Sequence, residues 1–113
     1  MNPFKVFDVE QKFEIENLDE KYYTLFSKYQ DQSKLNRAYK ILKDPVARAI
    51  MLCSLNGFSI PDFQIAKEVM NMQVTKEMLV AAEKNIFESA LKQDWANAWI
   101  WAQKYSYIKR ILG

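Results

Sequence analysis

Apolar residues recur along this chain mostly at intervals of three and four, the spacing of one face of a helix. The clearest stretch begins at Leu35, and the pattern then changes at Asp44-Pro45. Proline disfavours helix in the residue before it but fits a first helical turn, which an aspartate oxygen can cap. The pattern therefore predicts one helix over 35–43 and a second that opens at Pro45. Their apolar positions are Leu35, Ala38, Tyr39 and Leu42 in the first, and Val46, Ala49, Ile50 and Cys53 in the second.

The same spacing predicts five further helices. Asn2-Pro3 opens a short one, Thr75 caps another, and the others cover about 18–30, 62–72 and 95–112. Short connections make 18–30 and 35–43 an antiparallel hairpin, and Asn56-Gly57 reads as a left-handed cap that ends the Pro45 helix. In the predicted helix 18–30 the inward residues are Leu18, Tyr22, Leu25, Phe26 and Tyr29. In the predicted helix 62–72 they are Ile65, Val69 and Met72.

The last predicted helix carries two apolar stripes, which a small bundle cannot easily bury together. One stripe begins at Trp95 and the other at Trp101. Two interpretations stay open. The second stripe packs against the N-terminal half of the chain, or it is left free for a partner. The stripes are Trp95, Ala98, Trp99 and Ala102, and Trp101, Tyr105, Ile108 and Leu112.

Composition narrows the class of protein. Half of the 113 residues are apolar and only two are glycine, which favours an all-α fold. The chain has no histidine and one cysteine, Cys53, on a helical stripe where a buried thiol is ordinary. Neither a catalytic triad, paired acids nor a phosphate loop is present, so we expect no enzyme, metal site or cofactor. The chain has no run of about 18 apolar residues, so the sequence predicts no membrane span. The acidic start resembles no targeting peptide, so we expect a bacterial cytoplasmic protein.

Charge is unevenly placed although the net charge is only +2. Residues 8–20 hold six acids against Lys12, whereas 28–48 hold six bases against Asp31 and Asp44. The basic stretch is either a solvated helix face or a docking surface for an acidic partner. The small net charge and the lack of a reading helix argue against nucleic acid.

One stretch resembles a known family. The pattern from Asn36 to Gly57, with Ala38-Tyr39, Pro45, Arg48-Ala49 and Ser54-Leu55 at fixed spacing, is similar to the end of the J-domain and the following turn in HscB-type co-chaperones, called Jac-type in mitochondria. The resemblance implies an L-shaped all-α protein with a J-domain-like helical hairpin in 1–57 and a three-helix C-terminal bundle in 58–113.

The resemblance also implies two protein partners. In the family, a basic face on helix two and a His-Pro-Asp tripeptide dock on a seventy-kilodalton chaperone of the HscA type and trigger ATP hydrolysis. Here Lys21 and Lys28 match the basic face, but Gln30-Asp31-Gln32 stands at the tripeptide position in a shortened loop. The resemblance therefore implies docking without a trigger, and Asp31 is better read as a turn or capping residue.

The second implied partner is the iron–sulfur scaffold protein IscU. On the family pattern, Glu68, Met70, Met72 and Tyr107 correspond to its contact positions, while Asn71 replaces an acid. From the residues alone, the methionines Met70, Met72 and Met78 fit a core at least as well as a binding surface. The alternative function is a helical adaptor or structural homodimer with no chaperone activity, which would use the aromatic last helix.

Overall fold

The computed structural model describes residues 1–113 as seven helices without a strand. This confirms the predicted all-α class. The helices are α1 (Pro3–Phe7), α2 (Leu18–Phe26), α3 (Gln32–Lys43), α4 (Pro45–Leu55), α5 (Phe63–Met70), α6 (Lys76–Leu91) and α7 (Trp95–Leu112).

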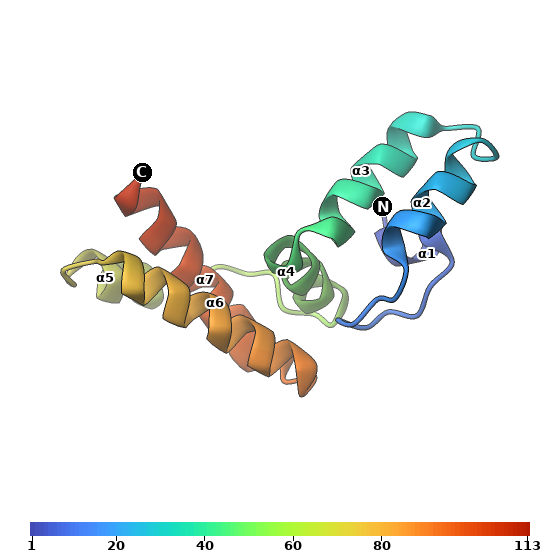
Figure 1. Cartoon of the computed structure of the whole chain (residues 1–113). Coiled ribbons are helices and arrows are strands. Elements are labelled where there is room, and N and C mark those ends of the chain that lie inside the picture. The colour runs from blue at the N-terminus through green and yellow to red at the C-terminus, as the bar shows by residue number, and fades with distance from the viewer.

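The seven helices form two limbs that meet at an angle (Figure 1). Helices α1, α2 and α3 make the N-terminal limb, α5, α6 and α7 make the C-terminal limb, and α4 lies at the corner. The radius of gyration is 15.5 Å and the extents are 50 × 27 × 21 Å. A compact chain of about 100 residues has a radius near 13 Å, so the molecule is elongated, as the predicted L shape requires.

Helices α2 and α3 form the predicted antiparallel hairpin. The Tyr22 hydroxyl donates to Asn36 Oδ1 at 2.6 Å, and the Tyr39 hydroxyl donates to the Asp19 carboxylate. A residue further along α2 thus pairs with a residue earlier in α3, so the two helices run antiparallel. The rings of Tyr22 and Tyr39 stack at 4.1 Å. The hairpin is therefore held by an aromatic and polar contact on the surface as well as by its core.

Helix α2 ends earlier than its periodicity predicts. Its last residue is Phe26, which is 41% exposed, so the inward position predicted for it is wrong. The chain turns back toward α3 at this point, and the ring of Phe26 lies against Tyr22 rather than in the core. Tyr29 still packs on the core, because its N–H bonds Leu25 O in one further turn.

Six of the seven helices start at a side chain that caps their first turn, whereas Asn17 before α2 makes no such bond. Asp44 accepts from Val46 N at 3.0 Å, and Thr75 accepts from Met78 N. Gly57 follows α4 with φ at +91°, which is the predicted left-handed cap. The side-chain oxygens that cap a helix in this way belong to Asn2, Asp31, Asp44, Asp62, Thr75 and Asp94.

Helix α7 resolves the problem of its two apolar stripes by packing against three other helices. Ala102 shares a buried cluster with Ala49 of α4 and Ile86 of α6, and Ile108 shares another with Val69 of α5 and Ala82 of α6. Trp101 packs against both clusters. The second stripe is thus covered by the chain itself, and only Leu112 at its end stays exposed.

The corner between the limbs is tied by Arg48 of α4. Its Nε donates to Leu42 O and its Nη1 to Phe13 O, both at 2.8 Å. Phe13 in turn lies 5.7 Å from Phe87 of α6, between ring centroids. Segment 8–17 is therefore fixed to both limbs at once.

Candidate protein-binding site

Helix α5 is apolar on two opposite sides, although it has only eight residues. On the inner side Ile65 and Val69 are 6% and 1% exposed. On the other side Phe63, Ala66 and Met70 follow one another at i, i+3 and i+7, which places them on one face. Phe63 is 78% exposed and Met70 is 74% exposed. An apolar stripe that faces solvent is a candidate contact for another protein.

The segment before α5 extends this apolar surface on an ordered backbone. Ile60 is 81% exposed, yet its carbonyl accepts from Trp99 Nε1 at 2.9 Å. The neighbouring N–H of Asp62 donates to Oε1 of Gln103, a buried side chain of α7, at 2.6 Å. The side chains of Ile60, Phe63 and Met70 are therefore held out from a fixed frame. We call these three residues the outer α5 surface.

Sequence reasoning missed Ile60 and Phe63 as site residues. Ile60 lies between the predicted cap at Gly57 and the predicted helix over 62–72, and nothing local to such a connection shows whether its side chain is covered. A signal for Phe63 was present, because Phe63, Ala66 and Met70 repeat at helical spacing opposite Ile65 and Val69. Two apolar faces on so short a helix indicate that one of them has a use other than the core of this chain.

The four predicted scaffold-contact residues gather at one end of the C-terminal limb. Glu68 and Met70 are exposed on α5, and Met72 follows the end of that helix with 46% exposure. Tyr107 of α7 is half-buried and packs on the cluster that contains Val69. The structure thus places Tyr107 at the small core shared by α5, α6 and α7.

Two methionine predictions need correction. Met72 was predicted to point inward with Ile65 and Val69, but α5 ends at Met70, so Met72 no longer shares their face. The interpretation of Met70 and Met72 as core residues is likewise wrong, since both are exposed. Of Met70, Met72 and Met78, only Met78 packs on a buried cluster.

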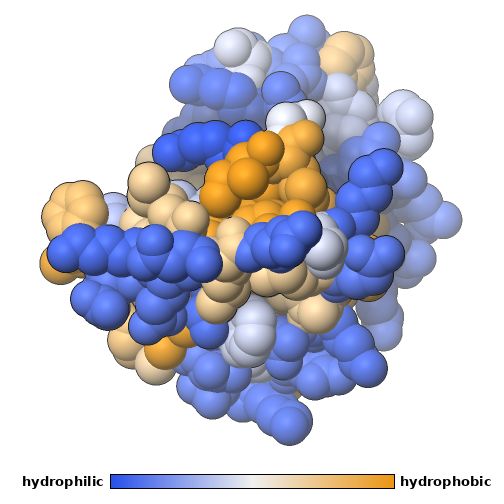
Figure 2. Space-filling view, turned by 90° about the vertical axis from the view of Figure 1, so that its left-hand side faces the viewer, coloured by the Kyte–Doolittle hydropathy of each residue, from blue (hydrophilic) through white to orange (hydrophobic).

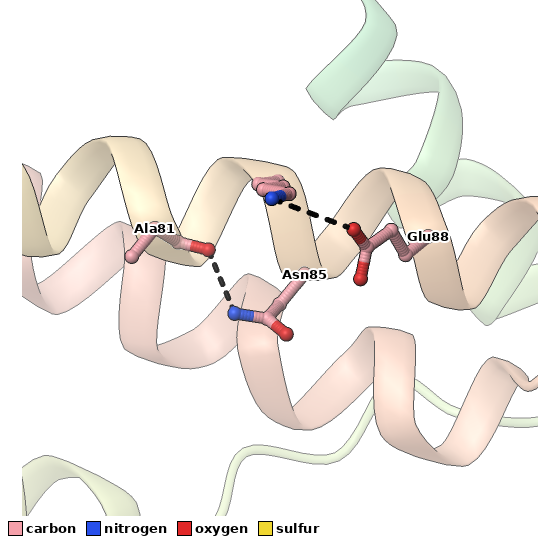
Figure 3. Close-up of polar contacts among 4 residues, drawn as sticks. Ala81, Asn85 and Glu88 are labelled. Atoms are coloured by element: carbon pink, nitrogen blue, oxygen red, sulfur yellow. Dashed lines mark hydrogen bonds and ion pairs between the residues drawn. The ribbon is translucent and has the colours of Figure 1, made fainter.

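Two further views show parts of the surface of the C-terminal limb (Figures 2 and 3). Figure 2 shows the end of the molecule where α5 and the C-terminus lie in Figure 1, and hydrophobic residues gather at its centre with hydrophilic ones around them. Helix α6 instead carries polar side chains that bond within the helix (Figure 3). Asn85 Nδ2 donates to Ala81 O at 2.8 Å, and Lys84 pairs with Glu88 at 4.0 Å. Such local pairs are typical of a solvated face.

The predicted chaperone-docking residues are engaged in local structure. Asp31 Oδ1 accepts from Lys34 N at 3.0 Å and caps α3, which confirms its interpretation as a capping residue. Gln32 Nε2 donates to Phe26 O at 3.2 Å and closes the loop, whereas the side chain of Gln30 is exposed. The loop residues at the tripeptide position therefore stabilise the hairpin turn.

The two lysines predicted to form a basic face do not share a helical face. Lys28 lies beyond Phe26, where α2 ends, so the expected spacing from Lys21 is lost. Lys21 Nζ donates to Glu16 O at 3.2 Å and lines a hollow with several carboxylates of the segment 8–16. Since α2 itself carries Asp19 and Glu20, its surface is not strongly basic.

Three ionisable groups have shifted pKa values. The hydrogen bond to Asp19 raises the pKa of Tyr39 to about 12, with desolvation as a smaller cause. Burial raises the pKa of the Cys53 thiol to about 11. Burial also lowers the pKa of Arg48, against the opposing effect of Asp44. All three belong to the packing of the hairpin and the corner, not to the outer α5 surface.

No group of three or more Cys, Asp or Glu residues is arranged to hold a metal ion. No helix combines the length and apolar character that crossing a bilayer requires.

The chain is thus an elongated helical protein with a hairpin limb, a bundle limb and an exposed apolar stripe on α5. Among solved structures, the chain is similar to the chaperone HscB from Vibrio cholerae, with a TM-score of 0.64 and 22% identity over 98% of this chain and 93% of that one. It is also similar to human co-chaperone protein HscB, with a TM-score of 0.64 and 19% identity over 99% of this chain and 79% of that one. The chain therefore has an HscB-like fold. No protein-family model matches the sequence, and no curated protein sequence matches it.

Proposed function

We propose that this chain is an HscB-like adaptor of iron–sulfur cluster assembly in the bacterial cytoplasm, which binds an IscU-type scaffold protein through the C-terminal limb. The observation that carries the proposal is the apolar surface exposed on α5 within an HscB-like fold that spans nearly the whole chain. The activity is binding, without chemistry of its own.

The outer α5 surface would supply most of the affinity. Phe63 and Met70 offer apolar area on one helical face, and Met70 adds a flexible, polarizable side chain that adapts to a partner. Glu68 lies about 140° round the helix from Phe63, so it brings no charge to this face, and Asn71 offers none. The contact is therefore more apolar than electrostatic, and we expect its affinity to depend weakly on salt.

Docking on an HscA-type chaperone is the second part of the proposal, at reduced strength. Asp31 and Gln32 are committed to the hairpin turn, and the cations nearest to α2 do not share one face. We therefore expect weak docking and no stimulation of ATP hydrolysis.

The test of scaffold binding is a calorimetric titration with purified IscU. We expect measurable affinity, and we expect the double variant Phe63→Ser and Met70→Ser to weaken it at least about tenfold. Val80→Ser is the matched control, because Val80 is an exposed apolar residue of α6 outside this surface. Both variants should fold, since exposed substitutions usually change stability by no more than about 0.5 kcal/mol. Absence of binding down to about millimolar would exclude the scaffold part of the proposal.

The test of chaperone docking is the ATPase rate of the chaperone with and without this protein and the scaffold. We expect no increase with the natural loop. Insertion of a longer loop with a His-Pro-Asp tripeptide between α2 and α3 should raise the rate if the docking face is intact. An unchanged rate would show that the face itself no longer docks.

A further inference from the structure

A groove runs between α4 and α7 at the corner of the molecule. It has a volume of about 460 Å³ and is open to solvent, and none of the outer α5 surface lines it. In Figure 1, α3 and the C-terminal end of α7 both project to the same side of α4, so the groove lies in the crook between the limbs. The residues that line it are Asp44, Val46, Ala47, Ile50, Tyr105, Ser106, Lys109 and Arg110. We call it the elbow groove.

The floor of the elbow groove is apolar and its α7 side is cationic. Val46, Ala47 and Ile50 come from α4, and Tyr105 faces them from α7. Lys109 Nζ lies 5.7 Å from the ring centroid of Tyr105, and Arg110 Cζ lies 5.8 Å from that of Tyr107. Neither cation belongs to either of the two ion pairs in the structure. Asp44 is the one acid of the lining, and its carboxylate is committed to the first turn of α4. The unpaired charge at the groove is therefore positive.

The helices that surround the groove share this charge. Helices α3, α4 and α7 contain no aspartate or glutamate, whereas α2 contains two, α5 one and α6 three. The carboxylates of the chain thus belong to caps, to these other helices and to the segment between α1 and α2. The cations carried by α3, α4 and α7 are Lys34, Arg37, Lys40, Lys43, Arg48, Lys104, Lys109 and Arg110.

We propose that the elbow groove binds a short amphipathic segment of a partner protein, with apolar side chains on the floor and carboxylates against Lys109 and Arg110. Complementary charge steers such a segment to the crook and fixes its direction. The apolar floor favours a peptide over a nucleic acid backbone, which would leave Val46 and Ile50 without contacts. An amphipathic segment laid into an apolar groove is a common mode of peptide recognition.

The test uses two synthetic peptides that share leucines at i, i+3, i+4 and i+7. One carries glutamate at its other positions, and the other carries lysine. With isotope-labelled protein, nuclear magnetic resonance titration should show amide shifts at Ile50, Tyr105 and Lys109 for the glutamate peptide, and none for the lysine peptide. Replacing Lys109 and Arg110 by glutamine should weaken binding at least about tenfold.

The control for lost charge replaces Lys76 and Lys92 by glutamine. Both are exposed cations at the two ends of α6, outside the elbow groove and outside any ion pair. This variant should bind the glutamate peptide as the natural protein does. Equal weakening by both double variants would overturn the proposal, because net charge would then explain the binding. So would no shifts at millimolar peptide, or a single-stranded oligonucleotide that displaces the peptide and binds more tightly.

Discussion

The two limbs are held together by side chains of different size. The N-terminal limb buries large residues, among them Phe4, Leu35 and Leu42, each at 1% exposure or less. The C-terminal limb buries four alanines, Ala82, Ala90, Ala98 and Ala102, together with branched residues such as Ile86 and Ile108. Small residues let two helices approach closely and leave few large apolar groups inside.

This difference divides the roles of the limbs. The N-terminal limb uses its large apolar residues for its own core and its loop polar groups for capping. The C-terminal limb fills half of its buried apolar positions with alanine, and large residues such as Phe63 and Met70 lie outside. The comparison predicts that truncation damages the N-terminal limb most, that enlargement damages the C-terminal limb, and that removal of outer residues affects binding alone.

The largest expected effect is Leu42→Ala in the N-terminal limb. Leu42 is fully buried between α1, α3 and α4, so its truncation leaves a cavity and should lower the free energy of unfolding by about 2–5 kcal/mol. Urea denaturation followed by circular dichroism measures it. Ile60→Ala, an exposed truncation, should change stability by no more than about 0.5 kcal/mol. Equal values for the two variants would show that α3 is not packed as described.

Ala102→Leu makes the opposite change in the C-terminal limb, because it enlarges a buried side chain. Ala102 is 1% exposed between α4, α6 and α7, and added methylenes have no space there without moving a helix. We expect a loss of about 1–3 kcal/mol in the same assay. Ala96→Leu on the exposed side of α7 is the matched control and should be nearly neutral. A neutral Ala102→Leu would mean that the close packing of this limb is not tight.

Most of the fold was predictable because local signals agreed. Apolar spacing placed the helices, and Asp44-Pro45 and Gly57 marked their ends, since capping depends on neighbours in the sequence. What failed depended on distant residues. The spacing continued through Phe26 and Met72 where the helices had ended, and the two stripes of α7 could be assigned only once α4 was seen against them.

The candidate site was less predictable for the same reason. Met70 and Tyr107 were reached through a family resemblance, and Phe63 was not reached at all. Exposure of an apolar residue is a property of the assembled molecule, because Phe63 would be buried if another helix crossed α5. Arg48 shows the same limit, since its bond to Phe13 O joins residues 35 positions apart.

Asp31→Ala separates capping from docking in the N-terminal limb. Loss of the bond from Lys34 N should cost about 1 kcal/mol, the usual cost of removing a helix cap. Thermal unfolding measures it. Gln30→Ala, in the same exposed loop, should leave the midpoint unchanged. If Asp31→Ala were as neutral as Gln30→Ala, the carboxylate would be free for a partner and its structural role would be refuted.

The last expected effect concerns Cys53, at the joint between the limbs, and it is confined to alkaline pH. Its thiol donates to Trp95 O of α7 at 3.6 Å, and burial raises its pKa to about 11 from an ordinary value near 9. The folded state therefore favours the protonated thiol. Its contribution to stability is complete below about pH 9 and is lost as the pH rises through about 11.

Because Tyr39 ionises in a neighbouring range, with a pKa of about 12, this loss is measured as the difference between the natural protein and Cys53→Ala across alkaline pH. The same thiol reports on the joint at pH 8, where iodoacetamide should label it far more slowly in the folded protein than in denaturant. Labelling at equal rates would mean that α4 parts readily from α7. The two limbs would then be independent bodies, and the elbow groove between them would have no fixed shape.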